Sequence, residues 1–356
     1  MVDYEKRWNR IMDHLDREEK DAFIVSSPAS TRYLCCSHVP QFPIVTSVVI
    51  TRDGNVIATA PSLEEFRARE EASVQELRIY APYKDIPTAG KNNTEALQEL
   101  IKELNLKDIL TDTPLKLEDI QQIESEFIAE MRTVKEPEEI KAIREAIKIT
   151  KIGEDALPDI IVPGRREGEA AAELDLLLRK NGAQCNSFPT IVASGMHGSF
   201  SHHDPGKKII RKGEAVIVDF GVYYDGYCSD MTRTIFTGRN PEMEEIYDLV
   251  AVAHLEAIRM VKAGVVLRDI DERAREVFRE KKMARYFVHS IGHGMGLEVH
   301  ENCTANPPSV SLLSDNKAEP GNVFTIEPGL YFPGKGGVRI EDDILVTEDG
   351  YEVLTR

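Results

Sequence analysis

The sequence contains no apolar run close to the ~18 residues that a membrane-spanning helix requires. Its start, MVDYEKRWNR, also lacks the apolar core of a signal peptide. We therefore expect a cytoplasmic protein with no membrane partner. Cysteine is scarce, and the five residues have a spacing that matches neither a disulfide framework nor a zinc knuckle. Reduced thiols are expected for Cys35, Cys36, Cys185, Cys228 and Cys303.

Basic residues are too few to balance the acidic ones. The 44 Lys and Arg against 61 Asp and Glu leave a formal net charge of −17, which argues against nucleic acid as a partner. Such an excess of acid favours solubility, and it is also typical of enzymes that hold divalent metals with carboxylates. A glycine-rich strand-to-helix fingerprint for nucleotides is absent. With 356 residues, 42% of them hydrophobic, the chain is long enough for two domains.

Residues 1–128 alternate short apolar runs with polar helical segments, which predicts a small α/β domain. The expected strands are 22–27, 47–51, 55–60 and 108–112, and the expected amphipathic helices are 4–19 and 93–106. We find no cluster of candidate ligands in this part of the sequence. His14 and His38 are isolated, and a lone histidine is usually structural or solvated.

A second domain is expected over residues 129–356. It opens with a helix that has Pro137 in its first turn, followed by Glu138 and Glu139, as helix starts often do. Further helices are expected at 167–182, 242–264 and 267–282. Strand-like runs lie between and after these helices, so the predicted fold class is α+β with antiparallel strands.

The stretch AVIVDFGVYYDGYCSDMTRTIF has the pattern of a β-hairpin that turns at Asp225 and Gly226. If these two residues form the loop, Asp219 and Asp230 are diagonal neighbours; if the loop lies one residue earlier, they are directly opposite. Both registers place the two carboxylates on one face, because side chains alternate along a strand. Two like charges there favour a divalent metal between them. The alternative is that one aspartate faces solvent.

Two later stretches add candidate acids. GNVFTIEPGLYF is expected to be a strand whose single acid, Glu327, lies in apolar surroundings, where a charge needs a partner. GGVRIEDDILV alternates so that Arg339 and Glu341 share a face, and the guanidinium is placed to orient neighbouring carboxylates. A solvated strand end is the alternative interpretation of the second stretch.

Two glycine-containing stretches supply histidines. SGMHGSFSHHDP either delivers a histidine to a site or lies on the surface. In GHGMGLEVHE, His293 and His300 are seven residues apart and glycines interrupt any helix, so this is not a His-Glu-x-x-His site. Carboxylates with one imidazole suit Mn²⁺, Co²⁺, Fe²⁺ or Zn²⁺. Four carboxylates carry too much charge for one ion, so we expect two ions, which can hold a bridging hydroxide as the nucleophile.

The order of these motifs resembles that of the pita-bread metallopeptidase superfamily. The histidine loop, DFG…GYCSDMTRT, GHGMGLEVHE, TIEPG and GGVRIEDD follow one another as in that family. FPTIVASG and a first domain of this size are similar to the Xaa-Pro peptidase branch. The resemblance covers the second domain closely and the first in size and pattern. It implies a creatinase-type α/β domain, a pita-bread catalytic domain and a homodimer.

The resemblance also implies roles for individual residues. The implied metal ligands are Asp219, Asp230, His293, Glu327 and Glu341. The implied catalytic residues, which stabilise the tetrahedral intermediate or accept a proton, are His202, His300 and Glu327. The implied substrate contacts are His202, His289, His300 and Arg339. His203, next to His202, is expected to point elsewhere.

The implied activity is metal-dependent hydrolysis of small peptides that have proline at the second position. Mn²⁺ or Co²⁺ is the first choice of ion, with Zn²⁺ or Fe²⁺ as alternatives. An Xaa-Pro dipeptidase is the first expectation and an aminopeptidase P the second, and a non-enzymatic pita-bread binding protein is disfavoured because all five ligands are kept. Thr304 stands where prolidases often carry an arginine, which favours the aminopeptidase. Cys35 and Cys36 replace a usual Thr-Gly pair, and the sequence does not explain them.

Overall fold

The structure, a computed structural model, describes residues 2–39, 43–301 and 311–356. The chain divides into two compact units, Met1–Arg132 and Thr133–Arg356. Cys303 and Thr304 lie outside the described residues. Within the described ranges, no helix combines the length and the apolar character that crossing a membrane requires.

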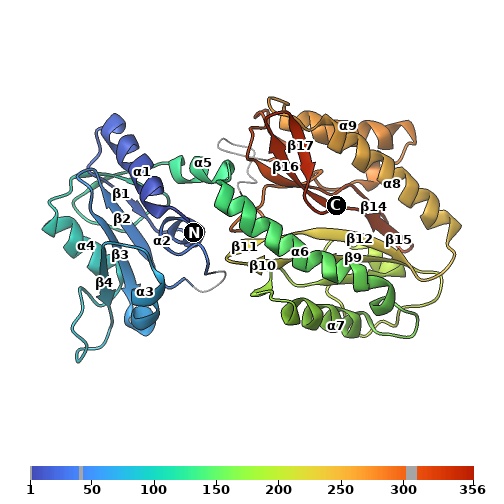
Figure 1. Cartoon of the computed structure of the whole chain (residues 1–356), viewed down its shortest axis with the longest axis horizontal. Helices are drawn as coiled ribbons and strands as arrows, with labels where there is room; N and C mark the ends of the chain where they lie inside the picture. The colour runs from blue at the N-terminus through green and yellow to red at the C-terminus, as the bar shows by residue number, and fades with distance from the viewer. Residues whose placement is uncertain (1, 40–42, 302–310) are drawn as a thin grey trace. The chain divides into compact units, whose positions relative to one another are not determined.

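The first unit is built on a six-stranded sheet with the order β4-β3-β2-β1-β5-β6 (Figure 1). Its strands are β1 (Ala22–Val25), β2 (Ser47–Thr51), β3 (Val56–Pro61), β4 (Glu76–Tyr80), β5 (Asp108–Thr111) and β6 (Gln121–Glu124). Strands β1 to β3 are antiparallel neighbours, whereas β4, β5 and β6 each join in parallel. The four predicted strands are confirmed. The sequence analysis did not predict β4 and β6: β6 is largely polar and exposed, and β4 is a short, mostly half-buried strand.

The helices of this unit are α1 (Tyr4–Glu18), α2 (Pro28–Cys35), α3 (Glu65–Glu71), α4 (Asn93–Glu103) and α5 (Phe127–Thr133). The two predicted helices are α1 and α4, and α4 buries Leu97 and Leu100 in the core of the sheet. Helix α2 ends at the cysteine pair, where Cys35 Sγ lies 3.6 Å from Cys36 Sγ. Both thiols are buried, as are those of Cys185 and Cys228, and the structure shows no disulfide among these four described cysteines.

The second unit combines four long helices with small antiparallel sheets. Its long helices are α6 (Pro137–Ile160), α7 (Glu167–Lys180), α8 (Pro241–Met260) and α9 (Leu267–Glu280), close to the predicted ranges. Its strands are β7 (Cys185–Asn186), β8 (Ile191–Ser194), β9 (Ala215–Phe220), β10 (Val222–Tyr224), β11 (Tyr227–Cys228), β12 (Met231–Phe236), β13 (Val323–Ile326), β14 (Gly329–Phe332), β15 (Gly336–Arg339), β16 (Asp342–Thr347) and β17 (Gly350–Val353). The sheets have the orders β11-β10-β7, β12-β9-β8, β13-β16-β17 and β14-β15. All strand pairings among the described residues of this second unit are antiparallel, which confirms the α+β prediction.

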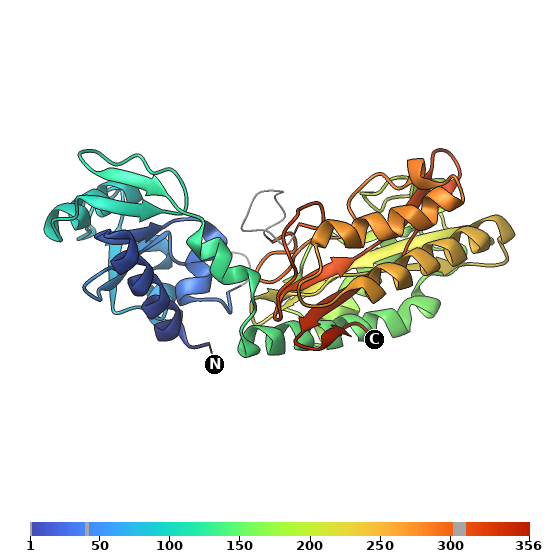
Figure 2. The same cartoon turned by 90° about the horizontal axis from the view of Figure 1, so that it is seen from above.

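Two apolar cores attach the helices to the strands. Helices α6 and α7 share one core with β8, β9 and β12, and α8 and α9 share another with β13 to β16. Figure 1 shows α6 and α7, in green, and α8 and α9, in gold to orange, on opposite sides of the strands, and in Figure 2 the α8–α9 pair lies in front. Val216, Val218 and Phe220 of β9 belong to the α6–α7 core. Because side chains alternate along a strand, Asp219 points to the other face of β9.

Two stretches that were each predicted as a strand form two strands: the first breaks at Pro328, where the sequence predicts a stop, and the break in the second corrects the sequence interpretation. GNVFTIEPGLYF forms β13 and β14 in different sheets, because Pro328 has no N–H to continue the ladder. GGVRIEDDILV forms β15 and β16, and the N–H of Glu341 between them donates to Thr232 O at 3.1 Å. Each break holds one of the candidate acids, Glu327 and Glu341.

Candidate metal centre and active site

The hairpin of β9 to β12 positions the two aspartates. Its two loop residues are Asp225 and Gly226, whose φ values of 48° and 80° are those of a tight hairpin turn. Asp219 lies opposite Thr232, which is the first of the two predicted registers. Asp219 and Asp230 therefore open onto the same cavity.

The segment Gly292–Glu301 is held against β13 by its backbone. The Thr325 N–H donates to His293 O at 2.8 Å, and the His293 N–H donates to Thr325 Oγ1 at 3.2 Å. A Cβ on Gly292 would lie 1.9 Å from Thr325 O. Glycine at position 292 is thus needed for the close approach that brings His293 to the acids.

The ring of His293 is oriented for metal binding. Its Nδ1–H donates to Gly294 O at 3.2 Å, which leaves Nε2 as an acceptor. Nε2 lies 3.6 Å from Asp230 Oδ2 and 3.6 Å from Glu327 Oε1. Burial, followed by the effect of His300, lowers the pKa of His293 to about 3, so the ring is neutral.

A buried ion pair fixes the end of this segment. Lys135 Nζ lies 2.7 Å from Glu301 Oε2, and the two side chains are only 1% and 2% exposed. Glu301 also accepts from the Leu297 N–H at 3.2 Å, and a Cβ on Gly296 would meet its carboxylate at 2.5 Å. Glu301 therefore holds the backbone that leads to His300. No sequence pattern predicts this pair, because its partners are 166 residues apart.

Four carboxylates converge near His293. They belong to Asp219, Asp230, Glu327 and Glu341. The ligand atoms of Asp230, His293 and Glu341 lie within 4.8 Å of one another. Burial and then the neighbouring acids raise the pKa values of Asp230 and Glu341 well above their ordinary values. Burial raises the pKa of Glu327 to about 8, although Arg339 opposes this shift.

This set of side chains fits divalent metal ions. Within the described residues, Oδ1 of Asp219 and Oδ1 of Asp230 are buried and have no hydrogen-bond partner, which costs free energy. A divalent cation would satisfy these atoms and offset the repulsion among the acids. Hard carboxylate oxygens with one neutral imidazole are the donors that Mn²⁺, Co²⁺, Fe²⁺ and Zn²⁺ accept.

A chain of hydrogen bonds leads from the acids to His289. Arg339 Nη2 pairs with Asp219 Oδ2 at 2.6 Å, and its Nη1 donates to the Tyr331 hydroxyl oxygen at 2.8 Å. His289 Nδ1–H donates to Ser290 O at 2.7 Å, so its Nε2 accepts from the Tyr331 hydroxyl at 2.8 Å. Both ring nitrogens of His289 are thus engaged within the protein. Burial lowers the pKa of His289 to about 4.

Tyr331 is a site residue that the sequence analysis did not identify. It lies in β14, where an aromatic residue in an apolar strand is ordinary, so no sequence signal marked it. Burial raises the pKa of its phenol to about 12, and the group therefore stays protonated and can donate to His289.

A cavity of about 520 Å³ opens onto these groups, which is the size of a small-molecule site. It is lined by all nine residues predicted from the sequence, namely His202, Asp219, Asp230, His289, His293, His300, Glu327, Arg339 and Glu341. The ring centroids of His300 and His293 are 4.0 Å apart. Burial and then His202 lower the pKa of His300. Apolar side chains complete the wall, among them Phe188, Ile191, Val299 and Leu313.

These pKa shifts predict that the metal-free protein loses stability as the pH rises from about 6.5 to about 8. Glu327 holds a proton up to about pH 8 when folded but only to about 4.5 when unfolded, so rising pH favours unfolding. Asp230 and Glu341 act in the same sense. Below about pH 6.5 the two histidines act in the opposite sense. His289 and His293 bind protons more readily in the unfolded chain, so their contribution to stability falls as the pH falls.

Thermal melts in chelator over this pH range measure the effect. Glu327→Gln, which cannot titrate, should show a flatter dependence than the unchanged protein. An equally steep dependence in this variant would contradict the assignment to Glu327.

The fold and the site define the class of protein: a two-domain, metal-dependent hydrolase whose centre is built from carboxylates and a histidine. The model of metallopeptidase family M24 matches residues 141–348, and that of the Creatinase/Prolidase N-terminal domain matches residues 7–146. The chain belongs to metallopeptidase family M24, and the resemblance seen in its motifs is confirmed.

Known proteins resemble the chain along nearly its whole length. An Xaa-Pro dipeptidase of Pyrococcus furiosus is 32% identical and covers 99% of this chain and 98% of its own. The structure of the Xaa-Pro dipeptidase from Bacillus anthracis matches with a TM-score of 0.86 and 33% identity, over 99% and 98% of the two chains. The X-Pro aminopeptidase from Thermotoga maritima matches with a TM-score of 0.85 and 30% identity, over 98% and 97%.

Proposed function

We propose that the protein is an Xaa-Pro dipeptidase, which hydrolyses the bond before proline in a small peptide. The observation that carries the proposal is the convergence of all nine predicted residues on one cavity. The substrate class is supported by the relatives from P. furiosus and B. anthracis, which are Xaa-Pro dipeptidases and span nearly the whole chain.

The proposed cofactor is a pair of divalent ions, Mn²⁺ or Co²⁺ in the first place and Zn²⁺ or Fe²⁺ otherwise. The proposed ligands are Asp219, Asp230, His293, Glu327 and Glu341. Four carboxylates would leave one ion with excess negative charge, and Arg339 pairs directly with only one of them. When bound, such ions supply an activated water and polarise the substrate carbonyl.

The protein's own side chains are proposed to bind and orient the peptide. An Xaa-Pro bond is a tertiary amide with no N–H, so the site needs no acceptor for that group. The apolar wall that includes Phe188 and Ile191 is suited to the prolyl ring. His202 and His300, which line the same cavity, are proposed to donate to the carbonyl oxygen as its negative charge develops.

Glu327 is proposed to accept the proton of the attacking water. Its Oε1 lies 3.6 Å from His293 Nε2, at the edge of the carboxylate cluster. We expect Arg339 to orient Asp219, and His289 to act through Tyr331 rather than by direct contact with the substrate.

Aminopeptidase P activity is the second candidate. Thr304 stands where prolidases often carry an arginine, and the T. maritima X-Pro aminopeptidase is as similar in fold as the dipeptidases. The peptides Ala-Pro, Ala-Pro-Ala and Met-Ala-Ala separate the candidates when they are offered to chelated protein reloaded with Mn²⁺, Co²⁺ or Zn²⁺.

We expect Ala-Pro to be hydrolysed fastest and Met-Ala-Ala to remain intact. Faster cleavage of Ala-Pro-Ala would favour the aminopeptidase over the dipeptidase. Cleavage of Met-Ala-Ala alone would contradict both proposals.

His300→Ala is expected to bind metal normally and to turn over about 10²-fold more slowly, because it removes a donor and no ligand. Metal analysis and steady-state kinetics on the same sample test this division of roles. A variant that loses its metal would show that His300 is a ligand.

We further propose that the protein is a cytoplasmic homodimer. Its family resemblance supports the dimer, and cysteine spacing that matches no disulfide framework supports a reducing compartment. Sedimentation equilibrium of the full chain measures the oligomeric state.

A further inference from the structure

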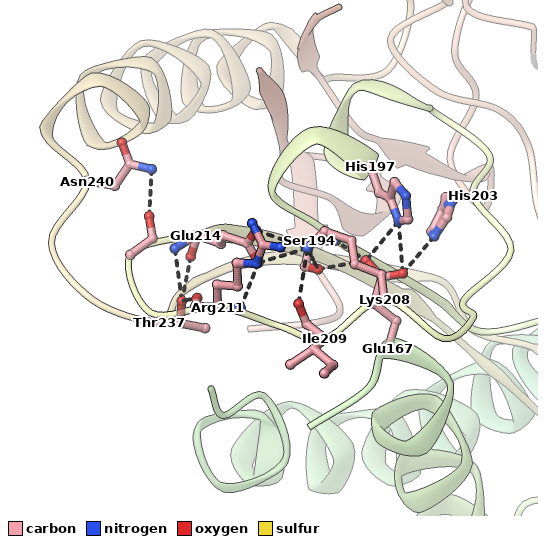
Figure 3. A network of polar contacts seen from close by, with 11 residues as sticks. Glu167, Ser194, His197, His203, Lys208, Ile209, Arg211, Glu214, Thr237 and Asn240 are labelled. Atoms are coloured by element: carbon pink, nitrogen blue, oxygen red, sulfur yellow. Dashed lines mark hydrogen bonds and ion pairs between the residues drawn. The ribbon is translucent and has the colours of Figure 1, made fainter. Parts of the chain in front are cut away.

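A second group of side chains of the types that bind metals lies among residues that the proposed reaction does not use. Glu167, the first residue of α7, is completely buried, and His197 and His203 reach its carboxylate from the loop after β8 (Figure 3). His197 Nδ1 lies 2.9 Å from Glu167 Oε2, and His203 Nε2 lies 3.0 Å from the same oxygen. The three donor atoms lie within 4.8 Å of one another.

The carboxylate of Glu167 is oriented by its other oxygen. Oε1 accepts from the Ser194 N–H at 2.8 Å and from the Ser194 hydroxyl at 2.7 Å, and His197 Nδ1 lies 3.1 Å from it. Oε2 thereby points at both imidazoles. A carboxylate whose second oxygen is held by hydrogen bonds is typical of metal sites, because this fixes the direction of the ligating oxygen.

The spacing of the donors suits an ion. Imidazole nitrogens and carboxylate oxygens bind Zn²⁺ at about 2.0–2.2 Å, so neighbouring ligands of one ion stand about 3 Å apart. The separations of 2.9 and 3.0 Å from Oε2 already have this value. The side chains of His197 and His203 are 26% and 12% exposed, so an ion can enter and water can complete its coordination.

The charges around Glu167 also favour a cation. Lys208 Nζ donates to Ser194 Oγ at 2.6 Å, but it is paired with Glu214 at 2.9 and 3.0 Å (Figure 3). Glu167 itself accepts hydrogen bonds from Ser194 and lies within hydrogen-bond distance of His197 and His203. A fully buried carboxylate is stabilised when a cation compensates its charge.

We propose that Glu167, His197 and His203 form an auxiliary site for a divalent transition-metal ion of the Zn²⁺ type. Two imidazoles and one carboxylate are a common donor set for Zn²⁺. The ion ties the start of α7 to the loop after β8, in which His202 adjoins His203. The inference does not depend on the substrate or the reaction proposed above.

Metal analysis of chelated protein that has been reloaded with Zn²⁺ and desalted tests the site. The unchanged protein should hold one Zn²⁺ per chain more than the double variant His197→Ala, His203→Ala. His197→Ala alone, at a partly exposed position that tolerates change, should weaken this binding at least about tenfold. The surface change His38→Ala is the matched control and should leave the Zn²⁺ content as it is in the unchanged protein.

A second experiment leaves the auxiliary cluster intact. A chain with Asp230→Asn and Glu341→Gln, which disables the catalytic centre, should still hold one Zn²⁺, and adding His197→Ala should remove it. Circular dichroism confirms that each variant is folded. Equal Zn²⁺ content in the unchanged protein and the folded double-histidine variant would overturn the proposal, as would no bound Zn²⁺ in the chain with the disabled catalytic centre.

Discussion

Asp230→Asn is expected to lower the rate of metal-dependent peptide hydrolysis by more than about 100-fold. Replacing a residue that only orients a metal ligand costs up to about 100-fold, and Asp230 is proposed to be a ligand itself. Asparagine preserves the size of the side chain but removes a negative ligand. Asp230 Oδ2 faces His293 Nε2 at 3.6 Å, and its Oδ1 is buried with no hydrogen-bond partner among the described residues. The substitution therefore acts on metal binding and leaves the fold in place.

The same substitution should raise the stability of the metal-free protein. Burial, followed by repulsion from Glu341 and Asp219, raises the pKa of Asp230, which means that its charged form is unfavourable without an ion. A neutral asparagine removes this penalty. In chelator, the melting temperature of Asp230→Asn should thus be higher than that of the unchanged protein. Added metal should raise the melting temperature of the variant by less.

Asp225→Asn is the matched control for this experiment. It makes the same chemical change in the same hairpin, at an exposed turn residue whose positive φ asparagine tolerates. It should leave activity and metal binding unchanged. Full metal-dependent activity in Asp230→Asn, or an equal loss in Asp225→Asn, would contradict the proposed centre.

Arg339→Met is expected to cost about 3–5 kcal/mol of stability, as the loss of one partner of a buried ion pair does. Arg339 is 3% exposed and its guanidinium contacts Asp219, Tyr331 and Thr232. Methionine leaves the Asp219 carboxylate without its cation. It also removes the hydrogen bonds that Arg339 donates to the hydroxyl oxygens of Tyr331 and Thr232. The Thr232 hydroxyl in turn donates to Glu341 Oε2 at 2.7 Å.

Metal affinity should fall by about 10–100-fold in the same variant, since Arg339 orients two of the proposed ligands without binding an ion. Urea unfolding and metal titration measure the two effects separately. Arg339→Lys, which keeps the charge but loses the fork of donors, should recover only part of each. Arg259→Met is the control, because its ion pair with Glu256 is on the surface and contributes little. A stability loss no larger than that of Arg259→Met would contradict the role of Arg339.

Local sequence patterns predicted the hairpin and most of the candidate site residues. The turn signal at Asp225 and Gly226 limited the hairpin to two registers, both of which put Asp219 and Asp230 on one face, and the structure has the first of them. Alternation along β9 then placed Asp219 on the face away from the α6–α7 core. The order of motifs in the second domain supplied the rest of the candidate residues, and all of them line one cavity.

Those patterns could not predict contacts between segments that are far apart in the sequence. The Lys135–Glu301 pair joins a helix start to the end of a glycine-rich segment, and neither residue has a neighbour in sequence that indicates the other. Tyr331 has the sequence of an ordinary strand residue and gains its role only because Arg339 and His289 meet it in space. The cluster around Glu167 was missed for the same reason, since 30 residues separate Glu167 from His197.

The return of activity with metal tests the central claim most directly. Protein freed of metal by a chelator is titrated with Mn²⁺ while Ala-Pro hydrolysis and bound metal are followed together. The unchanged protein should be inactive at the start, gain activity as the metal binds and lose it again in excess chelator, whereas folded Glu341→Gln should stay inactive throughout. Hydrolysis that persists in the chelated protein, or that Mn²⁺ restores in Glu341→Gln, would contradict the account.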